Sequence, residues 1–273
     1  MTSDPPRVSA TWLALRDPAD AASRSVELVA RLRRHLAGRT HLVLHDLGSG
    51  SGSMLRWLAP RLPGPQHWVL HDRDADLLAQ ATLDVPTAAD GSPVTAATRR
   101  GDLTRLTAAD LDGADVVTAS ALLDMLTAEE IDRVVAACAS AGCPTLFAIS
   151  VIGRVQLTPP DPLDAAVAAA FNDHQRRMLG DRRLLGPDAV GAAVAAFGRH
   201  GVGTVLRPSP WRLGAAQAEL TAEWFRGWVA AAREQRPELA GPLTDYAARR
   251  LAEAAAGRLG VLVGHLDLLA GAG

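Results

Sequence analysis

Three alternating glycines directly after a short apolar run are the feature that most constrains this fold. Residues 41–46 read HLVLHD, and residues 47–52 read LGSGSG. A short apolar run bounded by glycines predicts a buried strand that ends in a tight turn. Glycines in such a turn let the backbone approach a ligand closely, and the passage from a strand into a helix is where α/β proteins bind nucleotides.

The order of the predicted elements indicates an α/β fold. Apolar runs predict strands at residues 41–46, 67–71, 94–100, 115–118 and 145–151. Amphipathic segments predict helices at residues 11–37, 53–62, 75–83 and 128–140. Strands that alternate with helices through crossovers of this length form a parallel sheet wrapped by helices. We therefore expect a doubly wound sheet over residues 40–152.

The second half of the chain is predicted to add helices above this sheet. Residues 159–162 read PPDP and end the regular structure. Helices are expected at residues 164–177, 187–198, 222–234 and 244–256, and two more strands at 202–206 and 261–266. We expect an N-terminal helical cap segment over residues 1–39 and a main domain over 40–273. Cap insertions are predicted at about 155–198 and 211–257.

The composition excludes several classes of site. The chain has 273 residues, a net charge of −2 and no lysine, which excludes a Schiff-base lysine and a P-loop lysine. Its arginines are scattered among acidic residues, so no nucleic-acid partner is predicted. The two cysteines lack the spacing of a zinc site, and no metal is predicted. Without a leader-like segment or a long apolar run, we expect a cytoplasmic protein without a membrane partner, monomeric or homodimeric.

The glycine spacing departs from the commonest dinucleotide fingerprint. The pattern G-x-G-x-x-G requires glycine at position 53, where the chain has Ser53. Asp46 at the end of the strand would repel a pyrophosphate and would suit a cationic ammonium group better. A nicotinamide or flavin enzyme stays open, because Asp72 would also suit the ribose of an adenosine.

Residues 43–52 resemble motif I of the class I S-adenosylmethionine-dependent methyltransferases, the pattern E/D-x-G-x-G-x-G. In that family the acidic residue and the glycine loop hold the methionine end of the cofactor. The resemblance gives this role to Asp46 and to the loop residues Gly48, Ser49, Gly50 and Gly52. It implies a Rossmann-like methyltransferase fold, a doubly wound, seven-stranded, mostly parallel sheet whose last strand is antiparallel.

Further parts of the same resemblance follow in order along the chain. Asp72 takes the place of the acid that binds both ribose hydroxyls, and Arg73 beside it would flank the adenine. Asp102 in RRGDL takes the place of the aspartate that binds the adenine amine, with Leu103 beside it. The fourth strand would place two small residues beneath the cofactor, Ala119 and Ser120.

The resemblance covers residues 40–152 well and the remainder loosely. The family joins its last two strands by a short turn, whereas more than 50 residues separate them here. The whole chain is also similar to a group of actinobacterial methyltransferases, in WLALRDPADAASRS near its start and FNDHQRR in its middle. That likeness fixes no substrate.

The segment FNDHQ supplies the predicted catalytic base, His174. It lies on an alanine-rich helix directly after the fifth strand, where an acceptor would enter. A base is needed only if the acceptor atom carries a proton. Asn172 and Gln175 beside it are candidates for substrate binding. The alternative is a solvated helix end whose histidine is satisfied locally.

Four further residues have two interpretations each. Asp124, after the fourth strand, is a substrate-binding candidate or caps a turn. Trp211 stacks on a planar acceptor or fills the core. Arg16 and Arg24 reach the carboxylate of the cofactor or lie on a solvated helix face, which is the interpretation we prefer.

The favoured function is transfer of a methyl group from S-adenosylmethionine to a small-molecule acceptor, by in-line displacement, with S-adenosylhomocysteine as the product. O-methylation is preferred, and N- or C-methylation stays open. The alternatives are an NAD(P)-dependent oxidoreductase and a binding protein of the same fold without catalysis.

Overall fold

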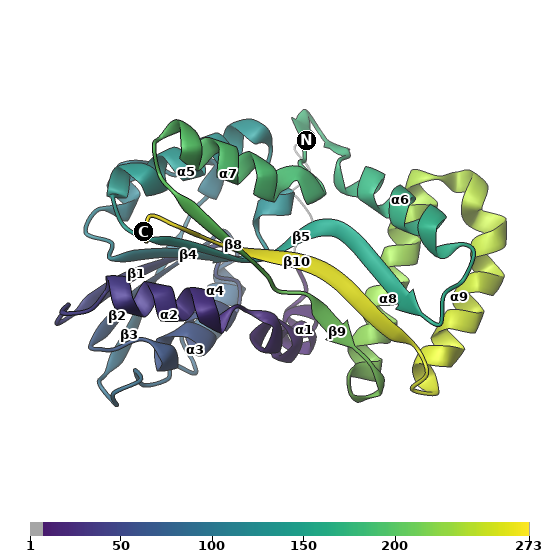
Figure 1. The fold of residues 1–273 in the computed structure, drawn as a ribbon, viewed down its shortest axis with the longest axis horizontal. Helices are drawn as coiled ribbons and strands as arrows, with labels where there is room; N and C mark the ends of the chain where they lie inside the picture. The colour runs from purple at the N-terminus through teal and green to yellow at the C-terminus, as the bar shows by residue number, and fades with distance from the viewer. Residues whose placement is uncertain (1–7, 273) are drawn as a thin grey trace.

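A computed structural model describes residues 8–272 as one large sheet with helices on both of its faces, a separate two-stranded sheet and a helical cap at one end (Figure 1). The sheet has the strand order β3-β2-β1-β4-β5-β10-β8. The strands are β1 (Leu42–Leu47), β2 (Gln66–Asp72), β3 (Val94–Arg100), β4 (Val116–Ser120), β5 (Thr145–Thr158), β8 (Thr204–Pro208) and β10 (Gly260–Ala270). The order reverses between β1 and β4, so their carboxyl ends flank the position where a doubly wound sheet binds its ligand.

The strand directions confirm the predicted fold class. The pairs β1–β2, β2–β3, β1–β4 and β4–β5 are parallel, while β10 is antiparallel to both β5 and β8. Short strands that the sequence did not predict are β6 (Met178–Leu179), β7 (Arg182–Arg183) and β9 (Trp211–Leu213). The last of these pairs with β10 and lengthens the sheet towards the cap.

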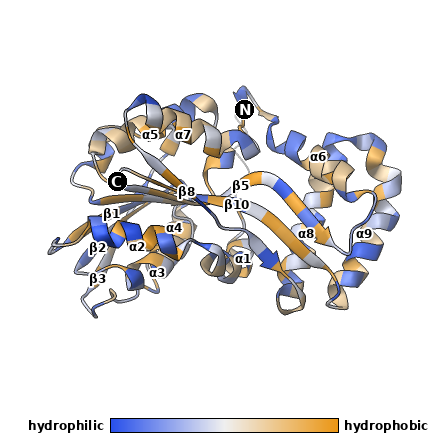
Figure 2. Cartoon of the chain, viewed as in Figure 1, coloured by the Kyte–Doolittle hydropathy of each residue, from blue (hydrophilic) through white to orange (hydrophobic). Residues whose placement is uncertain are grey.

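Two helical layers bury the faces of the sheet. The helices α2 (Val26–His35), α3 (Ser53–Leu58) and α4 (Ala75–Ala81) pack on one face, where Leu32, Leu55 and Trp68 belong to one core. The helices α5 (Ala128–Ala141) and α7 (Ala189–Arg199) pack on the other face. Figure 2 shows apolar strands between helices whose outer surfaces carry many hydrophilic residues. Two predicted cap segments, those containing α2 and α7, therefore cover the sheet instead of forming the cap.

The expected helix over residues 11–37 is interrupted. It forms α1 (Ala10–Ser23) and α2, with an extended residue, Arg24, between them (φ −57°, ψ 139°). The Ser25 side chain accepts the amide N–H of Leu28 and begins α2 as its N-cap. Helical periodicity continues through the break, so the pattern alone predicted one helix, and the capping serine was the overlooked signal.

The cap stands on strands that extend beyond the sheet. β5 and β10 continue as a long antiparallel pair, and β9 joins β10 there. The helices α6 (Asp164–Gln175), α8 (Ala218–Gln235) and α9 (Ala240–Ala255) pack beside this pair, at the right of Figure 1. They share a third core that includes Phe225, Trp228 and Tyr246.

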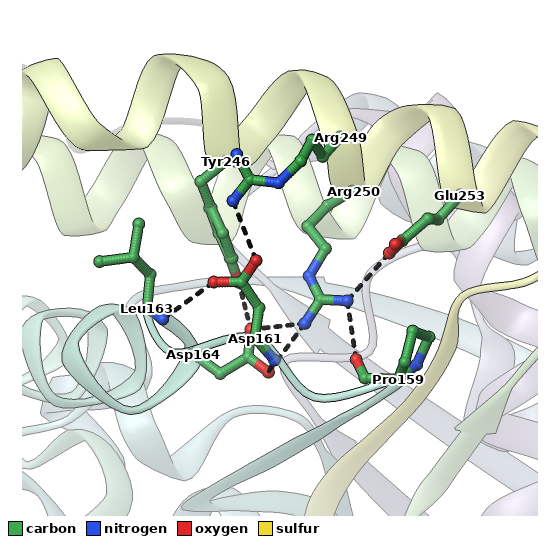
Figure 3. A network of polar contacts seen from close by, with 8 residues as sticks. All are labelled: Pro159, Asp161, Leu163, Asp164, Tyr246, Arg249, Arg250 and Glu253. Atoms are coloured by element: carbon green, nitrogen blue, oxygen red, sulfur yellow. Dashed lines mark hydrogen bonds and ion pairs between the residues drawn. The ribbon is translucent and has the colours of Figure 1, made fainter.

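A buried arginine joins α9 to the segment that enters the cap (Figure 3). Arg250 is 1% exposed, and its guanidinium donates to both carboxylate oxygens of Asp164 at 2.9 Å. It also donates to Glu253 at 2.9 Å and to the Pro159 carbonyl oxygen at 2.7 Å. The Tyr246 hydroxyl donates to Asp164 at 2.7 Å. The cap therefore compensates its buried charge through direct ion pairs.

Candidate functional site

The glycine turn connects β1 to α3 in a backbone conformation that favours glycine. Gly48, Gly50 and Gly52 have φ angles of 64°, 52° and 85°. A Cβ atom on Gly52 would lie 3.1 Å from the Ala81 backbone, and one on Gly48 would lie 3.0 Å from the Leu122 side chain. Both the left-handed backbone and the close packing therefore require glycine at these positions.

Asp46, on β1 just before this turn, is a buried carboxylate with an unused oxygen. Its side chain is 1% exposed, and Oδ1 accepts the Thr118 hydroxyl at 2.6 Å. Oδ2 is buried and has no hydrogen-bond partner among residues 8–272. Burial raises the pKa of Asp46 to about 7, although Thr118 and the nearby Arg24 act in the opposite direction. A donor that reached Oδ2, above all a cationic one, would stabilise the ionised form.

Asp72 ends β2 and fixes the glycine turn from the neighbouring strand. Its Oδ2 accepts the Gly50 N–H at 2.9 Å, and its Oδ1 accepts the Asp74 N–H at 2.9 Å. The Ser49 N–H donates to the His71 carbonyl at 3.0 Å, while the Ser49 hydroxyl is buried and unpartnered in the described chain. The structure thus brings Asp46, the glycine loop and Asp72 together.

The other cofactor candidates lie around the same carboxyl edge. Arg73 follows Asp72, and its carbonyl accepts the Arg100 guanidinium at 3.1 Å. Asp102 is exposed and accepts the Thr104 N–H at 2.9 Å, beginning a short turn whose Leu103 lies next to Gly48. On β4, Ala119 is buried and Ser120 is half-buried. Their roles in binding stay predictions.

The preferred interpretation of Arg16 and Arg24 was wrong. The Arg16 side chain is 15% exposed and pairs with Asp20, and Arg24 is buried more deeply. It is 3% exposed, so it does not lie on a solvated helix face. Its Nη2 donates to the hydroxyls of Ser53 at 2.8 Å and Ser120 at 3.1 Å, and its Nε is buried without a partner in the described chain. No described carboxylate forms an ion pair with it. Its position could not be predicted because it depends on the break between α1 and α2.

The helix α1 covers the glycine turn and also contacts the cap. The Asp17 carboxylate accepts the Ser53 hydroxyl and, at 2.9 Å, the Arg56 guanidinium, which joins α1 to α3. Leu13 lies 3.3 Å from where a Cβ on Gly50 would be. From the same helix, Trp12 packs edge-on against Trp211. The helix therefore links the region of the turn to the cap.

Trp211 and Asp124 both lie close enough to Arg16 to interact with its guanidinium. Trp211 is 2% exposed, donates to Asp20 at 2.9 Å, and lies under the Arg16 guanidinium, which forms an ion pair with Asp20 at 2.9 Å. Asp124 keeps some exposed surface, but burial raises its pKa to about 6, with Arg16 the one side chain that lowers it. No hydrogen bond to another described residue occupies the Asp124 carboxylate. Trp211 fills the core, and Asp124 remains available to a ligand.

The FNDHQ residues are joined to neighbouring elements. His174 Nε2 lies 3.3 Å from Glu234 on α8, and Nδ1 lies 3.3 Å from Arg177. Burial and Arg177 lower the pKa of His174. Asn172 donates to the Gly153 carbonyl at 2.8 Å, and the Gln175 backbone packs on Gly186. In this arrangement Asn172 and Gln175 support the contact of α6 with β5 and the following turn.

The described residues contain neither a metal-binding cluster nor a membrane-spanning helix. Within residues 8–272 no group of three or more His, Cys, Asp or Glu side chains is arranged to hold a metal ion. No described helix is both long and apolar enough to cross a membrane.

A family model described as a methyltransferase domain matches residues 44–144, which contain β1 to α5 and the glycine turn. No curated protein matches the chain. Solved structures with a similar fold include YjhP from E. coli (19% identity, 94% of this chain and 99% of that chain covered, TM-score 0.43). Another is a SAM-dependent methyltransferase from Geobacter sulfurreducens in complex with S-adenosyl-L-homocysteine (18% identity, 96% of this chain and 98% of that chain covered, TM-score 0.43). A third is the cyclopropane synthase MmaA2 from Mycobacterium tuberculosis (13% identity, 96% of this chain and 94% of that chain covered, TM-score 0.48).

Proposed function

Residues 44–144 form a methyltransferase domain of the class I, S-adenosylmethionine-dependent type, and from this premise we propose that the protein methylates a small molecule. The single observation that carries the proposal is the pair of buried, unpaired charges at the glycine turn, Asp46 and Arg24. O-methylation is the preferred reaction, with N- or C-methylation as the second choice.

The residues at the turn fit the methionine end of S-adenosylmethionine. That end carries an ammonium and a carboxylate, and the structure offers an unused carboxylate oxygen on Asp46 and an unused guanidinium N–H on Arg24. Buried charges normally have partners, so both atoms favour a zwitterionic ligand. Asp72 would bind the ribose hydroxyls, because a carboxylate that accepts two amide N–H groups still has free lone pairs.

The cofactor, when bound, supplies a sulfonium methyl group that is open to nucleophilic attack. The protein then has to hold the acceptor in line with that methyl group and keep water away, and such positioning supplies much of the rate. In this proposal α1 excludes water from the glycine turn, with Leu13 over Gly50. Asp46 and Arg24 fix the orientation of the methionine end.

An acceptor with an O–H or N–H group needs a proton acceptor, and we propose Asp124 for this role ahead of His174. The loop of Asp124 packs on the glycine turn through Leu122, and no other residue of the described chain hydrogen-bonds to the Asp124 carboxylate. A pKa near 6 leaves Asp124 ionised at neutral pH while keeping it basic enough to take up a proton. His174, by contrast, lies between Glu234 and Arg177.

The remaining expectations belong to the same proposal. The net charge of −2 and the absence of a basic stripe support a small-molecule acceptor over a nucleic acid. We propose a cytoplasmic enzyme, monomeric or homodimeric.

Calorimetric titration of the purified protein with S-adenosylmethionine, S-adenosylhomocysteine and NADH tests the proposal. We expect micromolar binding of the first two and none of NADH. Asp72→Ala should abolish this binding, whereas Asp76→Asn, at an exposed position one turn further along, should retain it. Binding of NADH alone would establish the oxidoreductase alternative. Cofactor binding without methyl transfer to any of a broad set of hydroxyl and amine acceptors would favour a binding protein.

A further inference from the structure

Another buried carboxylate, Asp267 on β10, contacts the segment that carries Arg24. It is 1% exposed, and its two oxygens accept backbone N–H groups from distant segments. Oδ2 accepts the Ser25 N–H at 2.7 Å, at the junction between α1 and α2. Oδ1 accepts the Ile149 N–H at 2.8 Å, on β5. One side chain thus joins the residue that follows Arg24 to the centre of the sheet.

The contact with Ile149 stabilises an unfavourable backbone conformation. Leu266 pairs with Ser150 and Leu268 with Phe147, so Asp267 lies opposite a bulge of two residues on β5. Ile149 in this bulge has φ +52°, a conformation that is costly for a β-branched residue. A charge-assisted hydrogen bond to its N–H compensates part of that cost. The strain is therefore coupled to the charge of Asp267.

Contacts starting from the same bulge also reach the Arg24 guanidinium. The Ala148 carbonyl accepts the N–H of Ala121, which has φ +51°. Ala121 follows Ser120, whose hydroxyl accepts the Arg24 guanidinium at 3.1 Å. Asp267 therefore supports Arg24 twice, through the backbone of Ser25 and through the β4–β5 edge that carries Ser120.

We propose that Asp267 is a positioning residue that aims Arg24 at the carboxylate of the cofactor. It touches neither cofactor nor acceptor, and it acts by fixing the α1–α2 junction against the bulge on β5. The inference rests on the proposed function, because it requires that Arg24 bind that carboxylate.

Two ligands separate this role from a general structural one. S-adenosylhomocysteine carries the amino-acid ammonium and carboxylate, whereas 5′-methylthioadenosine has the same nucleoside and thioether with neither group; the comparison with Arg24→Gln then assigns the loss to the carboxylate. We expect Asp267→Asn to weaken S-adenosylhomocysteine binding at least tenfold and to leave 5′-methylthioadenosine within twofold. Arg24→Gln should show the same selectivity, and the double variant should bind S-adenosylhomocysteine no more weakly than Arg24→Gln alone.

A matched pair at Ser25 keeps the test decisive if Asp267→Asn does not fold. Ser25→Pro removes only the N–H that Asp267 accepts and the capping hydroxyl, since φ −72° at this position suits proline. Ser25→Ala removes the capping hydroxyl and keeps the N–H. The proline variant should show the selective tenfold loss, and the alanine variant should bind both ligands like wild type.

The outcomes that contradict the proposal are distinct from failure of the proposed function. Equal losses for both ligands, or no loss for either, in Asp267→Asn and Ser25→Pro would overturn the positioning role. If the wild-type protein does not bind S-adenosylhomocysteine at all, the proposed function itself fails, and this inference fails with it.

Discussion

Two regions of this protein bury charged side chains, and they differ in whether those side chains contact an oppositely charged group. In the cap, Arg250 contacts the carboxylates of Asp164 and Glu253 directly (Figure 3). At the glycine turn, within residues 8–272, Arg24 lies over the Trp57 ring and hydrogen-bonds only to serine oxygens, and the Asp46 carboxylate hydrogen-bonds only to a threonine hydroxyl. Both arginines are almost completely buried, so burial alone does not distinguish the two regions.

The difference separates a structural network from a binding site. A buried charge that has its partners within the chain stabilises the fold once formed, and removing one partner leaves the other uncompensated. A buried charge without a partner destabilises the free protein and is expected where a ligand supplies the partner. We therefore expect substitutions in the cap to affect stability, and substitutions at the turn to affect affinity.

The largest effect is expected in the cap. Arg250→Met leaves Asp164, whose side chain is only 19% exposed, without its cation, which should reduce the free energy of unfolding by about 3–5 kcal/mol. Chemical denaturation measures this loss. Arg249→Met removes an exposed ion pair with Asp161, 56% exposed on the arginine side, and should cost under about 1 kcal/mol. If Arg250→Met folds stably but loses affinity for S-adenosylhomocysteine, the assignment of this network to structure is wrong.

The opposite pattern is expected at the turn. Asp46→Asn should weaken S-adenosylhomocysteine binding at pH 8 by about 2–3 kcal/mol, because the ligand's ammonium loses its buried partner. Its free energy of unfolding should stay equal or rise, because a desolvated charge is removed. Calorimetric titration and denaturation of the same preparations measure both. Asp112→Asn, exposed before β4, is the control. A marked fall in the free energy of unfolding would mean that Asp46 stabilises the fold, as Arg250 does in the cap.

Acidification provides a third test, through Asp46 itself. Its pKa in the free protein is about 7, so the site is largely protonated at pH 6. An ammonium binds the ionised form, and binding must then release a proton below pH 7. Affinity should fall by about tenfold per pH unit as the pH drops below 7 and stay constant above it. Calorimetric titration in two buffers with different ionisation enthalpies measures the number of protons released on binding. Asp46→Asn should show neither the release nor this pH dependence.

The sequence predicted the elements whose cause is local. The strands, the glycine turn and the acids at the ends of β1 and β2 follow from apolar runs and from residues that directly succeed them. Asp46 and Asp72 could be singled out because a parallel sheet brings the carboxyl ends of neighbouring strands together.

The rest depended on contacts between segments far apart in the chain. Arg24 is buried because the chain turns at Ser25. The Ser25 N–H donates to Asp267, which lies 242 residues further along the chain. Helical periodicity did not show that α7 covers the sheet while α6 joins the cap, because both helices are rich in alanine. β5 was predicted to end at residue 151 but runs to Thr158, since its outer part buries one face against the cap only. β10 was predicted to end at residue 266 but continues through Asp267 to Ala270 in the main sheet, where a buried acid interrupts the apolar run.

The smallest expected effect concerns a buried pair that fits neither class, His45 and His71. Their rings hydrogen-bond, Nδ1 to Nε2, at 3.0 Å, and burial lowers the pKa of each to about 4 with help from Arg99. Both are therefore neutral at pH 7 and satisfy each other without charge. A depressed folded-state pKa contributes stability above pH 6.5 that is lost as the pH falls towards 4.

Replacing one ring should reduce this acid sensitivity and sharpen the distinction between paired and unpaired groups. His71→Gln keeps a hydrogen-bonding side chain beside His45 but removes one titrating group. Between pH 7 and pH 4.5 its free energy of unfolding should fall by about 1–2 kcal/mol less than that of wild type. Urea denaturation across this range measures the slope, with His200→Gln at the exposed end of α7 as the control. An unchanged slope would mean that the pair does not titrate in this range. The acid sensitivity would then come from carboxylates such as those of the cap, whose ion pairs are lost on protonation.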